Sequence, residues 1–302
     1  MVLIPLVFFF WLKTGASRLR ALRKFVSGKL GIEADQSADA AKETIEILSH
    51  LSTYFIVGPE QKADAVLTIK KMCINLKFEK AICEIVGLHI ERTHVKGVPG
   101  EADKAIDEAL RDVFQACYTF LKLLVVKFPK GQETLFGYID KFACHIGIEK
   151  LNVADTIAEI LRDNSRLSSQ IPMSFLCKYI DAIKTWGRRA QWLSVFQAFM
   201  IIGGKPIKRN QDMILNLVLE EAEILDLDCD YKNSSHLSAS DERNGLSRLD
   251  LMAQNDHKRP IYSLLKYHTA CVDLLAAASA GKNPDVSIVY VVLLNLRTKI
   301  SI

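Results

Sequence analysis

The chain has 302 residues, of which 49% are hydrophobic, and this composition excludes an intrinsically disordered protein. Its 39 Lys and Arg side chains against 35 Asp and Glu leave a formal net charge of +4, too small to indicate nucleic acid as the main partner. Seven cysteines occur without a CxxC pair, so we expect no zinc or redox centre and buried, reduced thiols, as in a cytosolic protein.

The N-terminal run at residues 1–15, MVLIPLVFFFWLKTG, is apolar and is followed by positive charge. A membrane span needs about 20 apolar residues, and a secretory signal carries its charge before the apolar region. We therefore favour a broken or buried helix, or a start inside a longer protein, over a signal-anchor. The basic amphipathic pattern at 17–30 fits an anionic membrane surface, but packing on the next helix is the favoured interpretation.

Helical patterns then follow one another up to a turn at residues 97–100. We expect a helix from about residue 35 to 55, and a helical pair at 60–76 and 78–91. Apolar residues recur at helical spacing on all three: Ile45, Leu48, Leu51, Phe55 and Ile56; Ala65, Ile69 and Met72; and Ile82, Ile85, Val86 and Ile90. We assign residues 1–100 to an N-terminal helical region.

The longest uninterrupted pattern spans residues 101–128 and has acidic residues at its start, where the helix dipole favours negative charge. Its apolar stripe consists of Ile106, Leu110, Val113, Phe114, Cys117, Phe120, Leu121 and Leu124. This stripe is broader than a surface helix needs, so we expect burial on more than one side. Pro129 ends the pattern, and one further helix, carrying Leu135, Ile139 and Phe142, is predicted through about residue 146.

Helical patterns continue between residues 153 and 225. The first is short, 153–162, and Pro172 stands at the favourable first position of the second, which ends near Gly187. The third is predicted to end at Gly203-Gly204 and to bury Trp192, Val195, Phe196, Phe199 and Met200. The fourth, 207–225, begins with basic residues and ends with glutamates, against its dipole, so tertiary packing must hold it in place.

The stretch 227–260 is rich in Ser, Asn and Asp and poor in periodicity, which predicts a solvated loop. A C-terminal region, 261–302, follows. Its helix, 261–280, is expected to bury Leu264, Leu265, His268, Val272 and Leu275. The tail at 286–302 is apolar and rich in β-branched residues, so it fits a strand or a buried helix.

About ten helices with short connections and almost no strand signal predict an all-α fold. Helices in antiparallel pairs, without sustained heptads, fit an α-solenoid better than a coiled coil. A strict repeat of about 40 residues is not visible in the sequence.

The common nucleotide-binding and catalytic motifs do not occur in the sequence, which argues against an enzyme. Cys144 and His145, with Asp140 nearby, superficially offer a nucleophile, a base and a carboxylate. Adjacent helical residues point about 100° apart, so we do not expect the thiol and imidazole to align. His268 and Cys271 have metal-ligand spacing, but further ligands cannot be assigned, so a core histidine is favoured and no metal or cofactor is expected.

Two basic groups bracket one predicted helix, Arg188 and Arg189 before it and Lys205, Lys208 and Arg209 after it. Such clusters can bind phosphates, for instance an inositol phosphate. Because a helix of about fifteen residues separates the groups by about 20 Å, one ligand cannot bridge them. We favour surface charge or salt bridges between modules, and keep the five side chains as candidate anion or inter-module contacts.

Short motifs follow one another in order along the second half of the chain. They are Asp155-Thr156, Asp163-Asn164, Ile171-Pro172, Trp186-Gly187-Arg188, Ala190-Gln191-Trp192-Leu193, Phe196-Gln197, Gly204-Lys205, Gln211-Asp212-Met213, Lys266-Tyr267-His268, Leu274-Leu275-Ala276 and Gly281-Lys282-Asn283, with Gln132-Glu133 and Leu135-Phe136 upstream. Together they resemble the homology (RIH) domain shared by inositol trisphosphate receptors and ryanodine receptors, most closely its central cytosolic copy in inositol trisphosphate receptors. The resemblance covers about residues 112–283, with its core within 101–226, and lapses after Asn283.

The resemblance implies an armadillo-like α-solenoid, a noncatalytic module in the cytosolic part of a tetrameric calcium-release channel of the endoplasmic reticulum or another calcium store. The implied role is to couple ligand sites to the pore, with neighbouring solenoid modules as partners. The sequence lacks the family's β-trefoil, ligand-binding core and pore, so we expect neither a membrane span nor ion conduction by this chain alone. The alternative is a freestanding cytoplasmic interaction protein that binds partner helices or an inositol phosphate.

Overall fold

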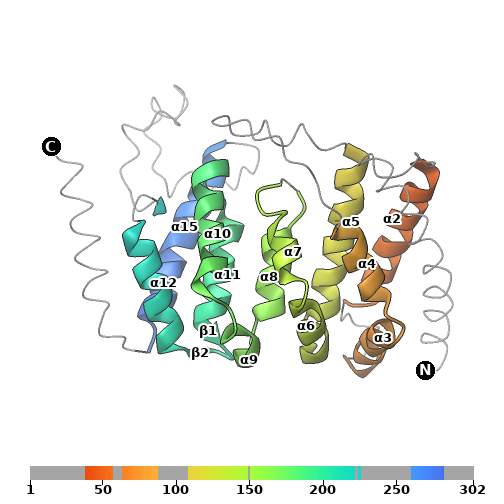
Figure 1. Cartoon of the computed structure of the whole chain (residues 1–302), viewed down its shortest axis with the longest axis horizontal. Coiled ribbons are helices and arrows are strands. Elements are labelled where there is room, and N and C mark those ends of the chain that lie inside the picture. The colour runs from red at the N-terminus through yellow and green to blue at the C-terminus, as the bar shows by residue number, and fades with distance from the viewer. Residues whose placement is uncertain are drawn as a thin grey trace. The chain divides into compact units, whose positions relative to one another are not determined.

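The computed structural model describes residues 38–56, 63–87, 108–148, 150–221, 224–225 and 260–281. These residues form twelve helices and one two-stranded hairpin (Figure 1), which confirms the predicted all-α class. The chain divides into two compact units, residues 1–167 and 168–302. None of the described helices combines the length and the apolarity that crossing a membrane requires.

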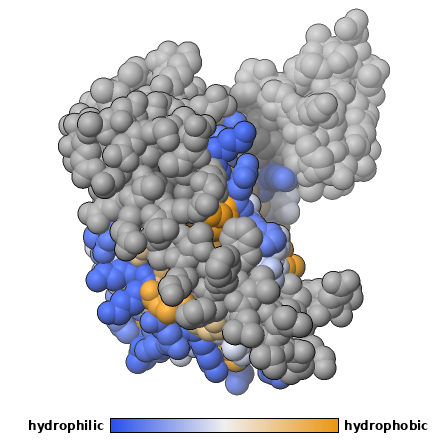
Figure 2. Space-filling view, turned by 90° about the vertical axis from the view of Figure 1, so that its right-hand side faces the viewer, coloured by the Kyte–Doolittle hydropathy of each residue, from blue (hydrophilic) through white to orange (hydrophobic). Residues whose placement is uncertain are grey.

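Five predictions concern residues outside the described ranges: the apolar run 1–15, the basic segment 17–30, the turn 97–100, the loop 227–260, of which only Pro260 is described, as the first residue of α15, and the tail 286–302. They stay predictions. On the face seen in Figure 2, hydrophilic residues make up most of the coloured surface, and small hydrophobic areas lie between them.

The first unit is built around its longest described helix, α5. Its elements are α2 (Ala38–Thr53), α3 (Ala63–Asn75), α4 (Phe78–Val86), α5 (Glu108–Val125), α6 (Pro129–Phe136), α7 (Ile139–Ala143) and α8 (Val153–Leu161). Helix α5 packs against α2, α4, α6 and α8. Every described residue of its predicted stripe is buried, which confirms burial on more than one side. Fully burying a phenylalanine such as Phe114 or Phe120 stabilises the fold by about 1.5–3 kcal/mol.

Two details of the first unit differ from the sequence predictions. The single helix predicted after Pro129 is two helices, α6 and α7, separated by a turn in which Tyr138 N donates to Leu135 O. Ile56, predicted on the apolar face of α2, is 56% exposed because α2 ends at Thr53 and a turn follows. The predicted core positions Leu135, Ile139 and Phe142 are nevertheless buried.

The second unit contains α10 (Met173–Trp186), α11 (Ala190–Met200), β1 (Ile201–Ile202), β2 (Lys205–Pro206), α12 (Lys208–Glu220) and α15 (Pro260–Ser279). A short helix, α9 (Ser165–Ser168), lies at the boundary of the two units along the chain, between two predicted helices. Helix α11 packs against α10, α12 and α15. All five aromatic and aliphatic residues predicted for its buried face are buried.

The hairpin that follows α11 was missed. The helix predicted to reach Gly203-Gly204 ends at Met200, and β1 pairs antiparallel with β2. Both glycines have positive φ, 56° and 71°, as the two central residues of a tight type I′ turn require. Strands of two residues are too short to give an alternating pattern in the sequence.

The buried face of α15 is also different from the prediction. Tyr267, Cys271, Leu274 and Ala278 are buried, whereas Val272 is 47% exposed and His268 and Leu275 are only partly covered. The predicted and observed faces are offset because α15 carries apolar residues on both. The side chains of Leu264 and Leu265 lie outside the described residues.

Candidate functional site

The five predicted basic contacts lie at the two ends of α11. Arg188 is exposed, while the guanidinium of Arg189 lies 5.6 Å from the ring centroid of Trp192. Lys205 is exposed on β2, and Lys208 and Arg209 are exposed in the first turn of α12. Because α11 has eleven residues, its length of about 16 Å separates the groups. The five side chains remain candidate contacts for an anion or a neighbouring module.

The start of α12 is held by buried side-chain amides, despite its basic first turn. That turn has no acidic residue and no side-chain cap, so charge does not favour this helix start. Asn210 Nδ2 donates to Phe199 O at 2.7 Å, and Gln211 bonds the end of α15. This agrees with the expectation that tertiary packing holds this helix.

The adjacent Cys144 and His145 point into different surroundings. Cys144 is exposed, and its Sγ donates to Asp140 O at 3.4 Å. His145 is 3% exposed, its Nδ1 lies 2.7 Å from the hydroxyl of Tyr118, and its ring stacks on Phe114. The imidazole therefore belongs to an aromatic core and is not directed at the thiol.

The cysteines fit the expected burial only in part. Cys73, Cys83, Cys117 and Cys271 are buried, Cys144 is exposed and Cys177 is partly exposed. Burial raises the pKa of the Cys117 thiol to about 12, which keeps it neutral and unreactive. Cys229 lies outside the described residues.

His268 is not the core histidine that the sequence suggested. It is partly exposed on α15, whereas Cys271 is buried. The core histidine of the described chain is His145. Among the described residues, no three His, Cys, Asp or Glu side chains are grouped so that they could hold a metal ion.

A buried glutamine joins α6 to α8 in the first unit. Gln132, 4% exposed, donates from Nε2 to Glu159 O at 3.0 Å and to Arg162 O at 2.8 Å. Asn164 Nδ2 in turn donates to Gln132 Oε1 at 3.0 Å, and Asn164 Oδ1 accepts from Leu167 N at the start of α9. Carbonyls at a helix C-terminus have no partner within the helix, so the amide satisfies two such acceptors, the buried Glu159 O and the part-buried Arg162 O.

The second unit contains the same arrangement. Gln211, 2% exposed, donates from Nε2 to Ala277 O at 2.8 Å and to Ala280 O at 3.1 Å, at the end of α15. Gly281 follows with a φ of +75°, and a Cβ there would lie 2.6 Å from Pro206 Cγ of the hairpin. The end of α15 is therefore fixed by a hydrogen-bonded amide and by close packing.

The two arrangements, which we call the first and second glutamine clamps, share four features. Each glutamine is the fourth residue of its helix, α6 or α12, and is followed by an acidic residue. Each binds two carbonyls three residues apart. Each lies within three helices in mutual contact, α5, α6 and α8 in one unit and α11, α12 and α15 in the other. No pattern in the sequence indicated this structural role directly, although both glutamines stand in the resemblance motifs.

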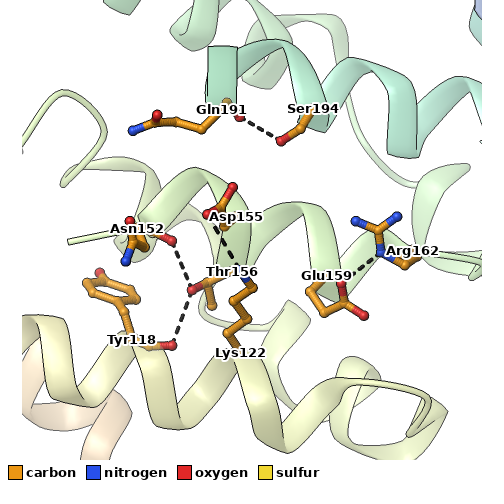
Figure 3. A network of polar contacts seen from close by, with 9 residues as sticks. All are labelled: Tyr118, Lys122, Asn152, Asp155, Thr156, Glu159, Arg162, Gln191 and Ser194. Atoms are coloured by element: carbon orange, nitrogen blue, oxygen red, sulfur yellow. Dashed lines mark hydrogen bonds and ion pairs between the residues drawn. The ribbon is translucent and has the colours of Figure 1, made fainter. Parts of the chain in front are cut away.

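Other motif residues likewise bind neighbouring helices. Thr156 Oγ1 shares its one proton between Asn152 O, one turn back, at 3.1 Å and Tyr118 O of α5 at 3.3 Å, and Lys122 Nζ of α5 lies 3.5 Å from Asp155 Oδ2 of α8 (Figure 3). These contacts join α5 to α8. In the second unit the hydroxyl of Tyr267 donates to Ile224 O at 2.8 Å.

Comparison with known proteins gives two findings. A family model described as the RIH domain matches residues 67–226. The inositol 1,4,5-trisphosphate receptor itr-1 of Caenorhabditis elegans is 25% identical over 188 residues, which are 60% of this chain and 6% of that protein. The chain therefore spans a small part of the length of this relative. The residues that the family model matches include both clamp glutamines, Gln132 and Gln211.

Proposed function

This chain belongs to the RIH domain family, and we propose that it is a noncatalytic, armadillo-like α-solenoid module in the cytosolic part of an intracellular calcium-release channel. The observation that carries the proposal is the family match over residues 67–226. In such a channel the module couples ligand sites to the pore. Its partners are neighbouring solenoid modules of a tetramer at the endoplasmic reticulum or another calcium store.

The packing of each unit supports a coupling role. When the helices of a unit are close-packed, a displacement of one helix moves the whole unit as a rigid body. In each unit a glutamine clamp fixes the end of one helix to the start of another. The units therefore have the internal connections that rigid-body movement requires.

An antibody raised against residues 108–221 tests the proposal in the source cells. We expect it to detect, in endoplasmic reticulum membranes, a polypeptide several times longer than 302 residues. Cross-linking should then capture it as a tetramer. A soluble protein of this length, without a larger form in the membrane fraction, would instead favour the freestanding interaction protein.

The exposed cations of the second unit make an inositol phosphate the specific alternative ligand. If the chain is a coupling module, calorimetric titration with inositol 1,4,5-trisphosphate and inositol hexakisphosphate is expected to show no saturable binding. The control is a variant with Lys205, Lys208 and Arg209 changed to alanine. Saturable binding to the native chain that this variant loses would contradict the proposal and support the alternative.

A further inference from the structure

Helix α15 carries mainly apolar residues on a second side, besides the side that is buried in the core. The described members of this side, which we call the second stripe, are His268, Val272, Leu275 and Ala276. Their spacing of three and four residues places them along one side of a helix. Val272 is 47% exposed, Ala276 is exposed, and His268 and Leu275 are partly covered. The packing of α15 on α11 and α12 therefore leaves much of the second stripe open.

The charged residues of α15 lie away from the second stripe. Lys266 and Asp273, both exposed, are turned about 100–120° from Val272 around the helix. The helix thus has one buried side, one charged side and one apolar side. In the first unit α5, whose apolar stripe is also broad, is buried on more than one side by α2, α4, α6 and α8. By the same pattern we expect a further helix to cover the second stripe of α15.

The apolar tail that follows α15 in the sequence has the features of such a helix. Residues 286–296 are almost entirely apolar, and this run exceeds the length of a typical strand. Asp285 precedes the run, and Arg297 and Lys299 follow it, where a carboxylate caps a helix start and cations stabilise a helix end. The many β-branched residues of the run lower its helix propensity only slightly. In the described part of the chain, strands of two residues offer little edge for a further strand. The sequence therefore favours a helix over a strand for the tail.

The connection between α15 and the tail suits two antiparallel helices. Helix α15 ends at Ser279, and residues 280–285 separate it from the tail. Connections of about 2–8 residues are usual between neighbouring helices of a bundle. Gly281 has a φ of +75°, the left-handed conformation that ends a helix and redirects the chain. A helix over residues 286–302 is about 25 Å long, against about 30 Å for the 20 residues of α15. The tail is therefore long enough to cover the whole second stripe.

We propose that residues 286–302 form a helix that packs antiparallel on the second stripe of α15. The occupant is a segment of the same chain, because so short a connection raises its effective concentration to about the millimolar range, above that of a second copy. The contact joins two apolar surfaces, and the charged side of α15 stays in water. A neighbouring module of the proposed channel then contacts the chain elsewhere. Because this packing requires no channel, it is tested on the full chain by itself.

Amide hydrogen exchange of the full chain, followed by mass spectrometry of peptides within residues 286–302, tests the packing. We expect these amides to exchange at least about a hundredfold more slowly than in an unstructured peptide. Val272→Asp is expected to reduce that protection about tenfold or more, because it places an unpaired charge beneath the tail. The matched control, Met173→Asp on α10, changes another exposed apolar side chain of the second unit and should leave the tail protected. Exchange of the tail at the rate of an unstructured peptide would overturn the proposal.

A second variant identifies the surface on which the tail packs. Ala276→Asp, one turn further along the second stripe, should reduce tail protection as Val272→Asp does. Because both residues are exposed, the protection of α11 should stay unchanged. Tail protection that survives both substitutions would contradict the proposal, since the tail would then pack on another surface. Loss of α11 protection in both variants would contradict it as well, because the second stripe would then belong to the core.

A dilution series identifies the occupant. About a hundredfold dilution of the chain should not alter the protection of the tail, because packing within one chain does not depend on concentration. Loss of tail protection on dilution would show that a second copy supplies the tail, against the proposal.

Discussion

Replacing Gln132 with leucine is expected to destabilise the first unit by about 2–3 kcal/mol, because a buried acceptor left unpaired, here Glu159 O, costs about 1–3 kcal/mol and the part-buried Arg162 O costs less. The substitution leaves Glu159 O and Arg162 O without their donor and removes the acceptor of Asn164. Urea unfolding followed by circular dichroism, with hydrogen exchange of α8, measures the loss. The matched control is Thr134→Ala on the same helix, whose hydroxyl bonds only Lys130 O within α6.

The variant Gln132→Glu separates lost hydrogen bonding from lost packing. Glutamate has nearly the shape of glutamine, but its carboxylate cannot donate to the two carbonyls. We expect a loss at pH 7 at least as large as for leucine, with partial recovery at pH 5, where a protonated carboxyl donates one bond. If Gln132→Leu costs no more than Thr134→Ala, below about 0.5 kcal/mol, the first clamp does not hold α8.

Apolar periodicity predicted most helices because burial follows local spacing. On α5 every described residue of the predicted stripe is buried, and the same holds for the aromatic face of α11. Because the apolar residues of such a helix are concentrated in one stripe, the sequence identifies which side of the helix is buried. Helix ends were less accurate, as the break between α6 and α7 shows.

The spacing of apolar residues did not identify which face of α15 is buried. Apolar residues at Leu275 and Val272 compete with those at Leu274 and Cys271. The observed face includes Tyr267, whose hydroxyl bonds Ile224 O, a partner 43 residues away in the chain. Local spacing contains no information about such a partner, so the choice depends on tertiary contacts.

The glutamine clamps were missed for the same reason. A glutamine in the first turn of a helix is ordinarily a solvated residue. The carbonyls that Gln132 binds lie 27 and 30 residues further along the chain. Those of Gln211 lie 66 and 69 residues further. Only the motifs of the resemblance drew attention to either position, and they did not indicate the bonds.

The clamps also show a repeat that is not visible in the sequence. The helices α5, α6 and α8 correspond in order, mutual contact and clamp position to α11, α12 and α15. The connection from α6 to α8 is short, whereas that from α12 to α15 contains residues 227–259. Because this connection is so much longer in the second unit, the corresponding helices are not separated by equal numbers of residues, and a search for a fixed sequence period does not find them.

If the second clamp stabilises its unit as the first does, Gln211→Leu should destabilise the second unit by about 1–3 kcal/mol, because the two carbonyls that lose their donor are part-buried. Ala277 O and Ala280 O would lose their donor at the end of α15. Fluorescence of Trp192, buried in α11, reports this unit when the other two tryptophans, Trp11 and Trp186, are replaced by phenylalanine. The exposed Asn216→Ala on the same helix is the control. Gln211→Leu should lower the urea midpoint of the Trp192 signal and leave the hydrogen exchange of α5 unchanged. Equal midpoints for the two variants would show that the second clamp does not stabilise its unit, and the correspondence between the units would then be one of shape alone.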